Sequence, residues 1–118
     1  MFDVILFLVL IQIKHFYFDF VNQSDNEIAN KGVYGNLIGM GHSLKHGLGT
    51  FAVGIVFVEW HVALFVALID TIMHYHIDWF KMRFGEKDLR NKRFWIHFGL
   101  DQLSHQLTYL LILVLLML

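Results

Sequence analysis

The sequence predicts an all-α protein, an integral membrane bundle of four up-and-down helices. Of its 118 residues, 57% are hydrophobic and only 16% are charged, which leaves more apolar side chains than a soluble domain of this length can bury. The chain has no proline to interrupt a helix. Four apolar stretches approach the length of about 20 residues that a membrane-crossing helix needs. They are residues 1–21, 37–58, 61–80 and 94–118.

These four stretches form a single transmembrane domain, residues 1–118. The first stretch begins with Asp3 instead of lysine or arginine and has no small-residue cleavage site, so we expect it to be a membrane helix and not a signal peptide. The segments between the stretches are residues 22–36, a tight corner at Glu59 and Trp60, and residues 81–93.

The basic residues predict how the bundle is oriented. Segment 81–93 holds six lysines and arginines, whereas segment 22–36 holds only Lys31. Short loops rich in lysine and arginine stay in the cytoplasm, so we expect segment 81–93 there and both termini on the other side. The formal net charge of −1 gives no reason to expect nucleic acid as a partner, because such binding depends on positive charge.

Each stretch also carries one pair of histidine or aspartate residues spaced four apart. The pairs are His15 with Asp19, His42 with His46, His74 with Asp78, and Asp101 with His105. Residues at this spacing share a helix face, and in an alternating bundle all four pairs fall at one depth, in the cytoplasmic half. Ionisable groups in hydrocarbon are costly unless they are paired, bound to metal or hydrated. We therefore expect the eight side chains to converge on the bundle axis.

Imidazole and carboxylate groups in a chain without cysteine form a ligand set for divalent metals, with zinc favoured and manganese or iron as other options. Eight ligands exceed the need of one tetrahedral zinc, so we expect two ions. Asp19, Asp78 or Asp101 would bridge the ions or act as a base. Six further residues are expected to contact the ligands or a substrate, namely Gln12, Gln23, Asp70, Lys81, His97 and Gln102. Lys81 would hold a substrate phosphate or mark the membrane edge as a snorkelling lysine.

Two other uses of these residues stay open, a proton relay or structural polar network, and haem ligation. Two bis-histidine haems would leave the three aspartates without a role. The glutamate and Glu-x-x-His pattern of ferritin-like di-iron bundles is absent from the sequence.

The motifs together cover nearly the whole chain: His15-x3-Asp19 with Gln23, His42-x3-His46, His74-x3-Asp78-x2-Lys81, and Asp101-Gln102-x2-His105. In these motifs the chain resembles the small bacterial and phage integral membrane proteins grouped as domain of unknown function 3307. The resemblance implies a bacterial or phage origin and a place in the bacterial inner membrane, but no activity. A looser similarity, in helical His/Asp motifs, links the chain to membrane-bound metal-dependent hydrolases, which is an analogy of chemistry.

From these observations we expect a membrane-embedded, metal-dependent hydrolase. Its substrate would be a phosphoester or other ester, in a lipid or lipid-linked molecule reached from the cytoplasmic leaflet, because a metal pair generates hydroxide near neutral pH and neutralises phosphoryl charge. The alternative is a non-enzymatic metal-binding membrane protein: a structural subunit, a sensor, a transporter or a phage-encoded modulator of a host membrane protein. The lipid bilayer is the expected partner, and a homo-oligomer is compatible with both readings.

Overall fold

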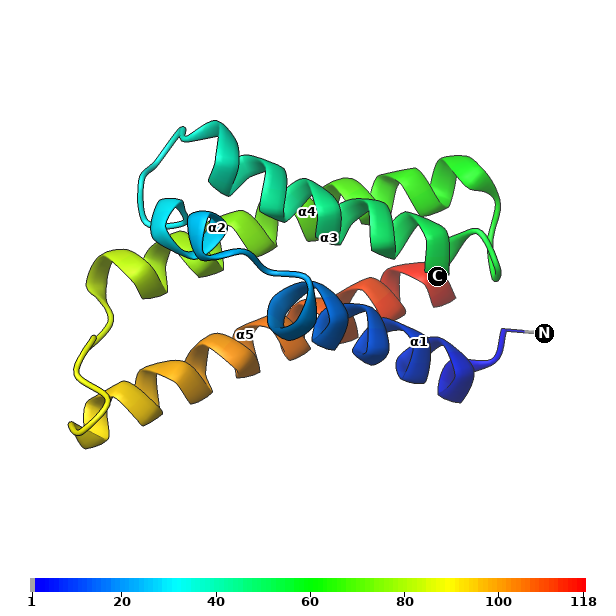
Figure 1. Ribbon diagram of the computed structural model, residues 1–118. Helices are drawn as coiled ribbons and strands as arrows, with labels where there is room; N and C mark the ends of the chain where they lie inside the picture. Colours follow the sequence, from blue (N-terminus) through cyan, green and yellow to red (C-terminus); the bar gives the residue numbers. More distant parts are fainter. Residues whose placement is uncertain (1) are drawn as a thin grey trace.

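The computed structural model describes residues 2–118, and this part of the chain contains helices and no strand. The elements are α1 (Val4–Phe16), the π-helical segment η1 (Tyr17–Val21), α2 (Asp25–Asn30), α3 (Leu37–Gly54), α4 (Trp60–Phe84) and α5 (Lys92–Met117). The four long helices run lengthwise beside one another (Figure 1). Both termini and the turn between α3 and α4 lie at one end of the molecule, and α2 and the loop between α4 and α5 lie at the other.

The all-helical class is confirmed, and three helices are long and apolar enough to cross a membrane. They are Val4–Val21, Trp60–Phe84 and Lys92–Met117, and they correspond to the first, third and fourth predicted stretches. The predicted start of the first stretch, Met1, lies outside the described residues. Helix α3 is not among the three, because its 18 residues include five glycines, two histidines and a lysine. It also ends at Gly54, four residues before the predicted end, and a turn follows.

Side-chain caps determine where the helices begin. The side chains of Asp3, Asn36 and Asn91 accept hydrogen bonds from backbone N–H groups in the first turns of α1, α3 and α5. Ser24 and Glu27 form a reciprocal capping box that starts α2. The prediction that residues 22–36 only separate two helices was therefore incomplete. The Ser-x-x-Glu spacing of Ser24 and Glu27 is a sequence signal for the start of a helix.

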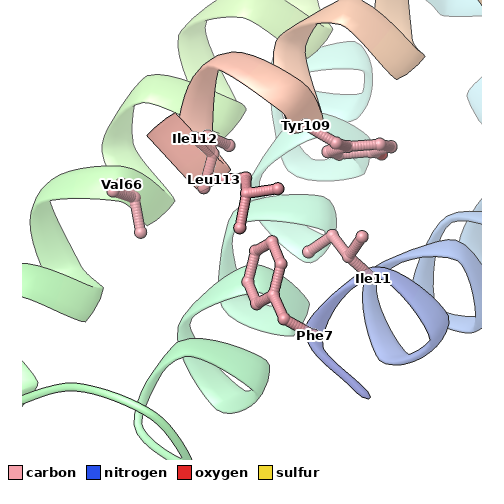
Figure 2. Close-up of a cluster of buried hydrophobic side chains, with 6 residues drawn as sticks. All are labelled: Phe7, Ile11, Val66, Tyr109, Ile112 and Leu113. Atoms are coloured by element: carbon pink, nitrogen blue, oxygen red, sulfur yellow. The ribbon is translucent and has the colours of Figure 1, made fainter. Parts of the chain in front are cut away.

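The half of the bundle next to the termini is filled by an apolar core. Phe7 and Ile11 of α1 pack against side chains of α4 and α5 (Figure 2). The other members are Val66, Tyr109, Ile112 and Leu113. Many large apolar side chains also face outward, including Ile5, Phe65 and Leu111, as expected for helices surrounded by lipid. The polar pairs occupy the other half of the bundle.

Helices α3 and α4 approach each other closely at glycines. A Cβ atom at Gly47 would lie only 1.8 Å from Thr71 Oγ1, and one at Gly54 would lie 3.0 Å from the Cβ atom of Ala63. Small residues allow two helix backbones to come together in this way. One result is that the ring of His46 on α3 stacks on the ring of His74 on α4, with centroids 3.6 Å apart.

Candidate metal centre

The structure brings all eight side chains of the four sequence pairs into one buried layer. His15 and Asp19 come from α1 and η1, and α3, α4 and α5 supply one pair each. None of the eight residues is more than 6% exposed. The layer lies in the half of the bundle beyond the apolar core, as the alternation of polar and apolar halves predicts.

The carboxylate of Asp19 is the first focus of this layer. Its Oδ1 atom lies 2.8 Å from Nε2 of His46, 3.1 Å from Nε2 of His42 and 3.4 Å from Nε2 of His74. Its Oδ2 atom lies 3.4 Å from Nε2 of His15. Histidine side chains from three helices, α1, α3 and α4, thus converge on the one carboxylate that η1 supplies.

The position of Asp19 depends on a local departure from α-helical geometry. It lies in η1, where the N–H of Asn22 donates to the carbonyl of Tyr17 at 2.7 Å, a π-type bond across five residues. Such segments recur at functional sites. The sequence interpretation treated residues 1–21 as one regular helix, and no residue pattern in the stretch signals the wider turn.

Asp78 is the second focus. Its Oδ1 atom lies 3.1 Å from Nε2 of His105, and its Oδ2 atom lies 3.0 Å from Nε2 of His74 and 3.4 Å from Nε2 of His42. His42 and His74 therefore stand between the two carboxylates. Asp101 lies at the edge of the layer, with its Oδ1 atom 3.5 Å from Nε2 of His105.

Two groups of donor atoms are compact enough to hold a metal ion. The first is Asp19, His42, His46 and His74, and the second is His74, Asp78 and His105, with the atoms of each group within 4.8 Å of one another. A neutral imidazole has one lone pair to give, so His74 can serve only one ion. Asp19 with His42 and His46, and His74 with Asp78 and His105, are then two sets of three ligands.

Several buried polar atoms of the layer have no hydrogen-bond partner among the described residues. They are both ring nitrogens of His74, Oδ2 of Asp78 and Oδ1 of Asp101. His74 Nε2 and Asp78 Oδ2 are only 3.0 Å apart but are not aligned for a hydrogen bond. Buried polar atoms are almost always satisfied, and a cation between His74 Nε2 and Asp78 Oδ2 would satisfy these two atoms. The residues present therefore fit a divalent metal.

Outer contacts orient two members of the layer, His15 and Asp19. Tyr109 OH lies 2.7 Å from His15 Nδ1, and Gln102 Oε1 lies 2.9 Å from His15 Nε2. Both nitrogens of His15 thus have protein partners, and His15 belongs to neither compact group. Gln23 donates to the backbone carbonyl of Asp19 at 2.7 Å. Contacts of this kind fix the orientation of metal ligands.

Glu27 of α2 is a further outer contact, which the sequence analysis missed. Its Oε1 atom lies 3.2 Å from His42 Nδ1 and accepts from Lys45 at 2.5 Å. Burial opposes ionisation of this carboxyl, but hydrogen bonds from Lys45, Ser24 and His42 outweigh it and lower the pKa of Glu27 to about 2. The ionised group can accept the Nδ1 proton of His42, which leaves His42 Nε2 free to bind a metal.

A second ion pair lies beneath the layer, and the sequence analysis foresaw only one half of it. Lys14 is 7% exposed, and its Nζ atom donates to Asp70 at 2.8 Å and to Tyr109 OH at 3.2 Å. Asp70 was expected from the sequence to contact a ligand or a substrate, and in the structure it pairs with Lys14. A lone lysine in an apolar stretch must find a partner, and this was the available signal.

Lys14 also lies 3.3 Å from His46 Nδ1. An ammonium group can only donate, so this contact favours a proton on Nε2 of His46, where it faces Asp19. Binding of a metal through Nε2 would place the ring proton on Nδ1, and Lys14 would then have to give up its contact with this nitrogen. The buried lysine and a metal therefore compete for His46.

Two other predicted residues lie apart from the layer. The Gln12 side chain donates to that of Gln106, and His97 accepts from the backbone N–H of Glu86 at 2.8 Å. Lys81 does reach the layer, with its Nζ atom 3.4 Å from Asp101 Oδ2. Lys31, interpreted from the sequence only as a loop charge, is 6% exposed and lies 3.2 Å from Asp78 Oδ2.

Comparison with known proteins gives one match. A family model described as "Protein of unknown function (DUF3307)" matches residues 5–118, which include every residue of the buried layer. No curated protein and no solved structure matches the chain.

Proposed function

The chain belongs to the DUF3307 family, whose description names no activity, and from the buried layer we propose that it is a membrane-embedded, metal-dependent hydrolase. Its substrate in this proposal is a phosphoester or other ester in a lipid or lipid-linked molecule, reached from the cytoplasmic leaflet. The observation that carries the proposal is the set of unpartnered nitrogen and oxygen atoms in a histidine and aspartate layer shielded from water.

The proposal includes a four-helix membrane bundle with α3 as the fourth crossing. The outward side chains of α3 support this, because Leu37, Leu44 and Leu48 are all more than half exposed and would contact lipid. We place the basic loop 81–93 in the cytoplasm of a bacterium and both termini on the other side of its inner membrane. This orientation agrees with the shared end of the two termini (Figure 1) and with the positive-inside rule.

The charges of the layer favour cation binding. Asp19, Asp78 and Asp101 are three carboxylates, and within residues 2–118 the lysines that form ion pairs with them are Lys31 and Lys81. Asp70 is already paired with Lys14. Neutral histidines leave the layer with net negative charge, which would be costly in a membrane. One divalent ion bound by these carboxylates would more than offset this negative charge, so a second ion would need a bound anion such as hydroxide.

Bound in this layer, divalent cations would activate water and neutralise charge on the attacked phosphoryl group. The overall reaction adds water across a P–O bond: the water oxygen bonds to phosphorus, the bond to the alcohol oxygen breaks, and a water proton passes to that oxygen. Asp19 and Asp78 lie among the histidines and serve as ligands. Asp101 lines a groove on the surface of the bundle, and in this proposal it accepts the proton of water as a general base.

Other functions fit the geometry less well. A haem iron between two imidazoles needs space for the porphyrin, whereas His46, His74 and His105 stack on one another with centroid distances of 3.6 and 4.2 Å. A transporter needs a polar path through the other half of the bundle, which is filled by the apolar core around Phe7 and Ile11 (Figure 2).

Metal analysis with an activity screen tests the proposal. We expect the detergent-purified protein to hold about two divalent ions per chain, and His74→Ala and Asp78→Ala to lose them together with hydrolysis of lipid phosphates. His61→Ala is the matched control, because its side chain is 56% exposed at the far end of α4. A protein without metal would overturn the site, and a fully metallated protein inactive on phosphomonoesters, phosphodiesters and carboxylic esters would favour a non-enzymatic subunit.

A further inference from the structure

A groove of about 480 Å³ runs along the surface between α4 and α5, next to the buried layer. Its walls are mainly apolar, with Met73, Ile77, Phe80 and Leu100 among them, and its polar lining residues are His76, Lys81, His97, Asp101 and Ser104. The volume lies within the range of about 300–1,000 Å³ that is usual for small-molecule sites. A chain-like apolar group with an anionic end matches this lining.

The groove opens sideways from the bundle. Phe80 is 63% exposed and Leu100 is 55% exposed, and both lie on helices that are long and apolar enough to cross a membrane. In a bilayer these side chains face the acyl chains of lipid. A lipid could therefore enter the groove laterally and keep its hydrocarbon chain out of water.

A second cavity, of about 270 Å³, borders the buried layer and shares one lining residue, Lys81, with the groove. It is lined by Asp19, Lys31, Lys81 and Gln102, among others. Lys81 borders both the groove and this cavity, so its side chain stands at their junction. Lys81 therefore lies between the apolar groove and a cavity whose lining includes Asp19, a carboxylate of the candidate metal centre.

Two lysines give the inner cavity its charge. The Nζ atom of Lys31 lies 3.2 Å from Asp78 Oδ2, and that of Lys81 lies 3.4 Å from Asp101 Oδ2 and 5.5 Å above the ring of Phe98. Each ammonium group pairs with a carboxylate of the layer, and Asp19 also lines the cavity, so a metal ion bound by these carboxylates would free the two lysines for a phosphate group.

We propose that the groove and the inner cavity together bind one lipid phosphate from the bilayer. Its hydrocarbon chain lies between α4 and α5, and its phosphate lies between Lys31 and Lys81, next to Asp19. This inference deepens the proposed function and rests on it for the fate of the lipid. Binding of the lipid depends only on the residues that line the groove and the cavity, and not on whether the lipid is then hydrolysed.

Photo-crosslinking tests the inference without any turnover. The probe is phosphatidic acid with a photoreactive group on its acyl chain, added to the full-length protein in nanodiscs, and the crosslinked peptides are identified by mass spectrometry. We expect crosslinks in the groove, on residues 73–84 and 97–104. Unlabelled phosphatidic acid should compete for them, whereas diacylglycerol and inorganic phosphate should compete at least about tenfold less well.

Matched variants locate the lipid. Ser104 lines the groove, and its hydroxyl donates only to the Leu100 carbonyl of its own helix, so Ser104→Trp should fill the groove and abolish the crosslinks. Gly41→Trp is the control, because it fills an apolar groove of about 530 Å³ between α3 and α4 that has no lysine or arginine in its lining. Lys81→Met should weaken competition by phosphatidic acid about tenfold, and Lys81→Arg should restore most of it.

Three results would overturn the inference. Crosslinks spread evenly around the bundle would show ordinary surrounding lipid, and crosslinks unchanged in Ser104→Trp would show that the groove is not the site. Competition by inorganic phosphate as strong as that by phosphatidic acid would assign the inner cavity to free phosphate. Intact groove labelling in a protein that hydrolyses no lipid phosphate would count against the hydrolase alone.

Discussion

At the scale of single residues, the buried pair of Lys14 and Asp70 makes the stability of the bundle sensitive to substitution. Asp70 is 1% exposed and also accepts from Thr50, so the pair is enclosed from all sides. Breaking a buried ion pair leaves one charge uncompensated, which costs more than the pair itself contributes. Because of this difference, single and double substitutions can distinguish an ion pair from two residues that only pack against their neighbours.

We predict that Asp70→Leu lowers the free energy of unfolding by about 3–5 kcal/mol, and that Lys14→Met in the same chain recovers most of this loss. Denaturant unfolding in micelles of the wild type, both single variants and the double variant measures the coupling. Additive losses in the double variant would mean that the two residues act independently.

Glu27 gives a second prediction at this scale. Its low pKa, about 2, keeps the carboxylate charged near neutral pH, where it can accept a proton from His42 Nδ1. We predict that Glu27→Gln lowers metal affinity about 10-fold to 100-fold, as the loss of a carboxylate behind a ligating histidine does elsewhere. Metal titration by calorimetry checks this. Asp25→Asn, on the same short helix, is the control. An equal loss of metal affinity in this variant would mean that the negative charge of α2, and not the contact of Glu27 with His42, supports metal binding.

The residues that could be predicted from the sequence are those whose partners lie one helical turn away. His42 with His46 and His74 with Asp78 share a face by spacing alone, and the cost of ionisable groups in lipid turns those faces inward. Lys14, Glu27 and Lys31 could not be assigned in this way, because their partners Asp70, His42 and Asp78 lie between 15 and 56 residues away. Such pairs depend on how the helices pack.

At the scale of elements, a different limit explains why the π-helical segment η1 and the short helix α2 were not predicted from the sequence. Apolar length and polar interruptions predict the long helices well, since both are averages over many residues. The π-helical turn at Asp19 is different, because one extra residue in a turn changes no average and leaves the four-residue spacing of His15 and Asp19 intact. Helix α2 is short, and its signal was the single capping box of Ser24 and Glu27.

The close approach of α3 and α4 can be tested by adding one methyl group. At Gly47 a Cβ atom would lie 1.8 Å from Thr71 Oγ1 and 3.0 Å from the Ala67 carbonyl oxygen, whereas at Gly41 no atom lies within 4 Å. We predict that Gly47→Ala destabilises the bundle by about 1–3 kcal/mol and lowers its metal content, because it moves His46 away from His74.

Gly41→Ala is the matched control on the same helix. It should leave the metal content unchanged and stabilise α3 by up to about 1 kcal/mol, the usual difference in helix propensity. Unfolding midpoints and metal analysis of the two variants provide the comparison. Equal effects of the two substitutions would show that α3 and α4 are not held at this distance in solution.

At the scale of the whole molecule, α3 decides the topology. Three helices are apolar enough to cross a membrane alone, and three crossings would place the two termini on opposite sides. Yet the termini lie at the same end of the bundle (Figure 1), and α3 pairs lengthwise with α4 through Gly47 and Gly54. The inner face of α3 carries His42 and His46, which lie in the buried layer and not in lipid. These polar residues lower the mean hydropathy of α3 although its outer face is apolar.

Single cysteines resolve the number of crossings, since the chain has none of its own. We predict that a membrane-impermeant maleimide added to intact cells labels Glu59→Cys and Leu118→Cys but not Asn26→Cys or Lys87→Cys, because residues 26 and 87 lie at the cytoplasmic end of the proposed bundle. All four positions are exposed, so lysed cells should label all of them. If Asn26→Cys reacted from the same side as Glu59→Cys, α3 would not cross the membrane. The outer face of α3 would then have to contact something other than lipid.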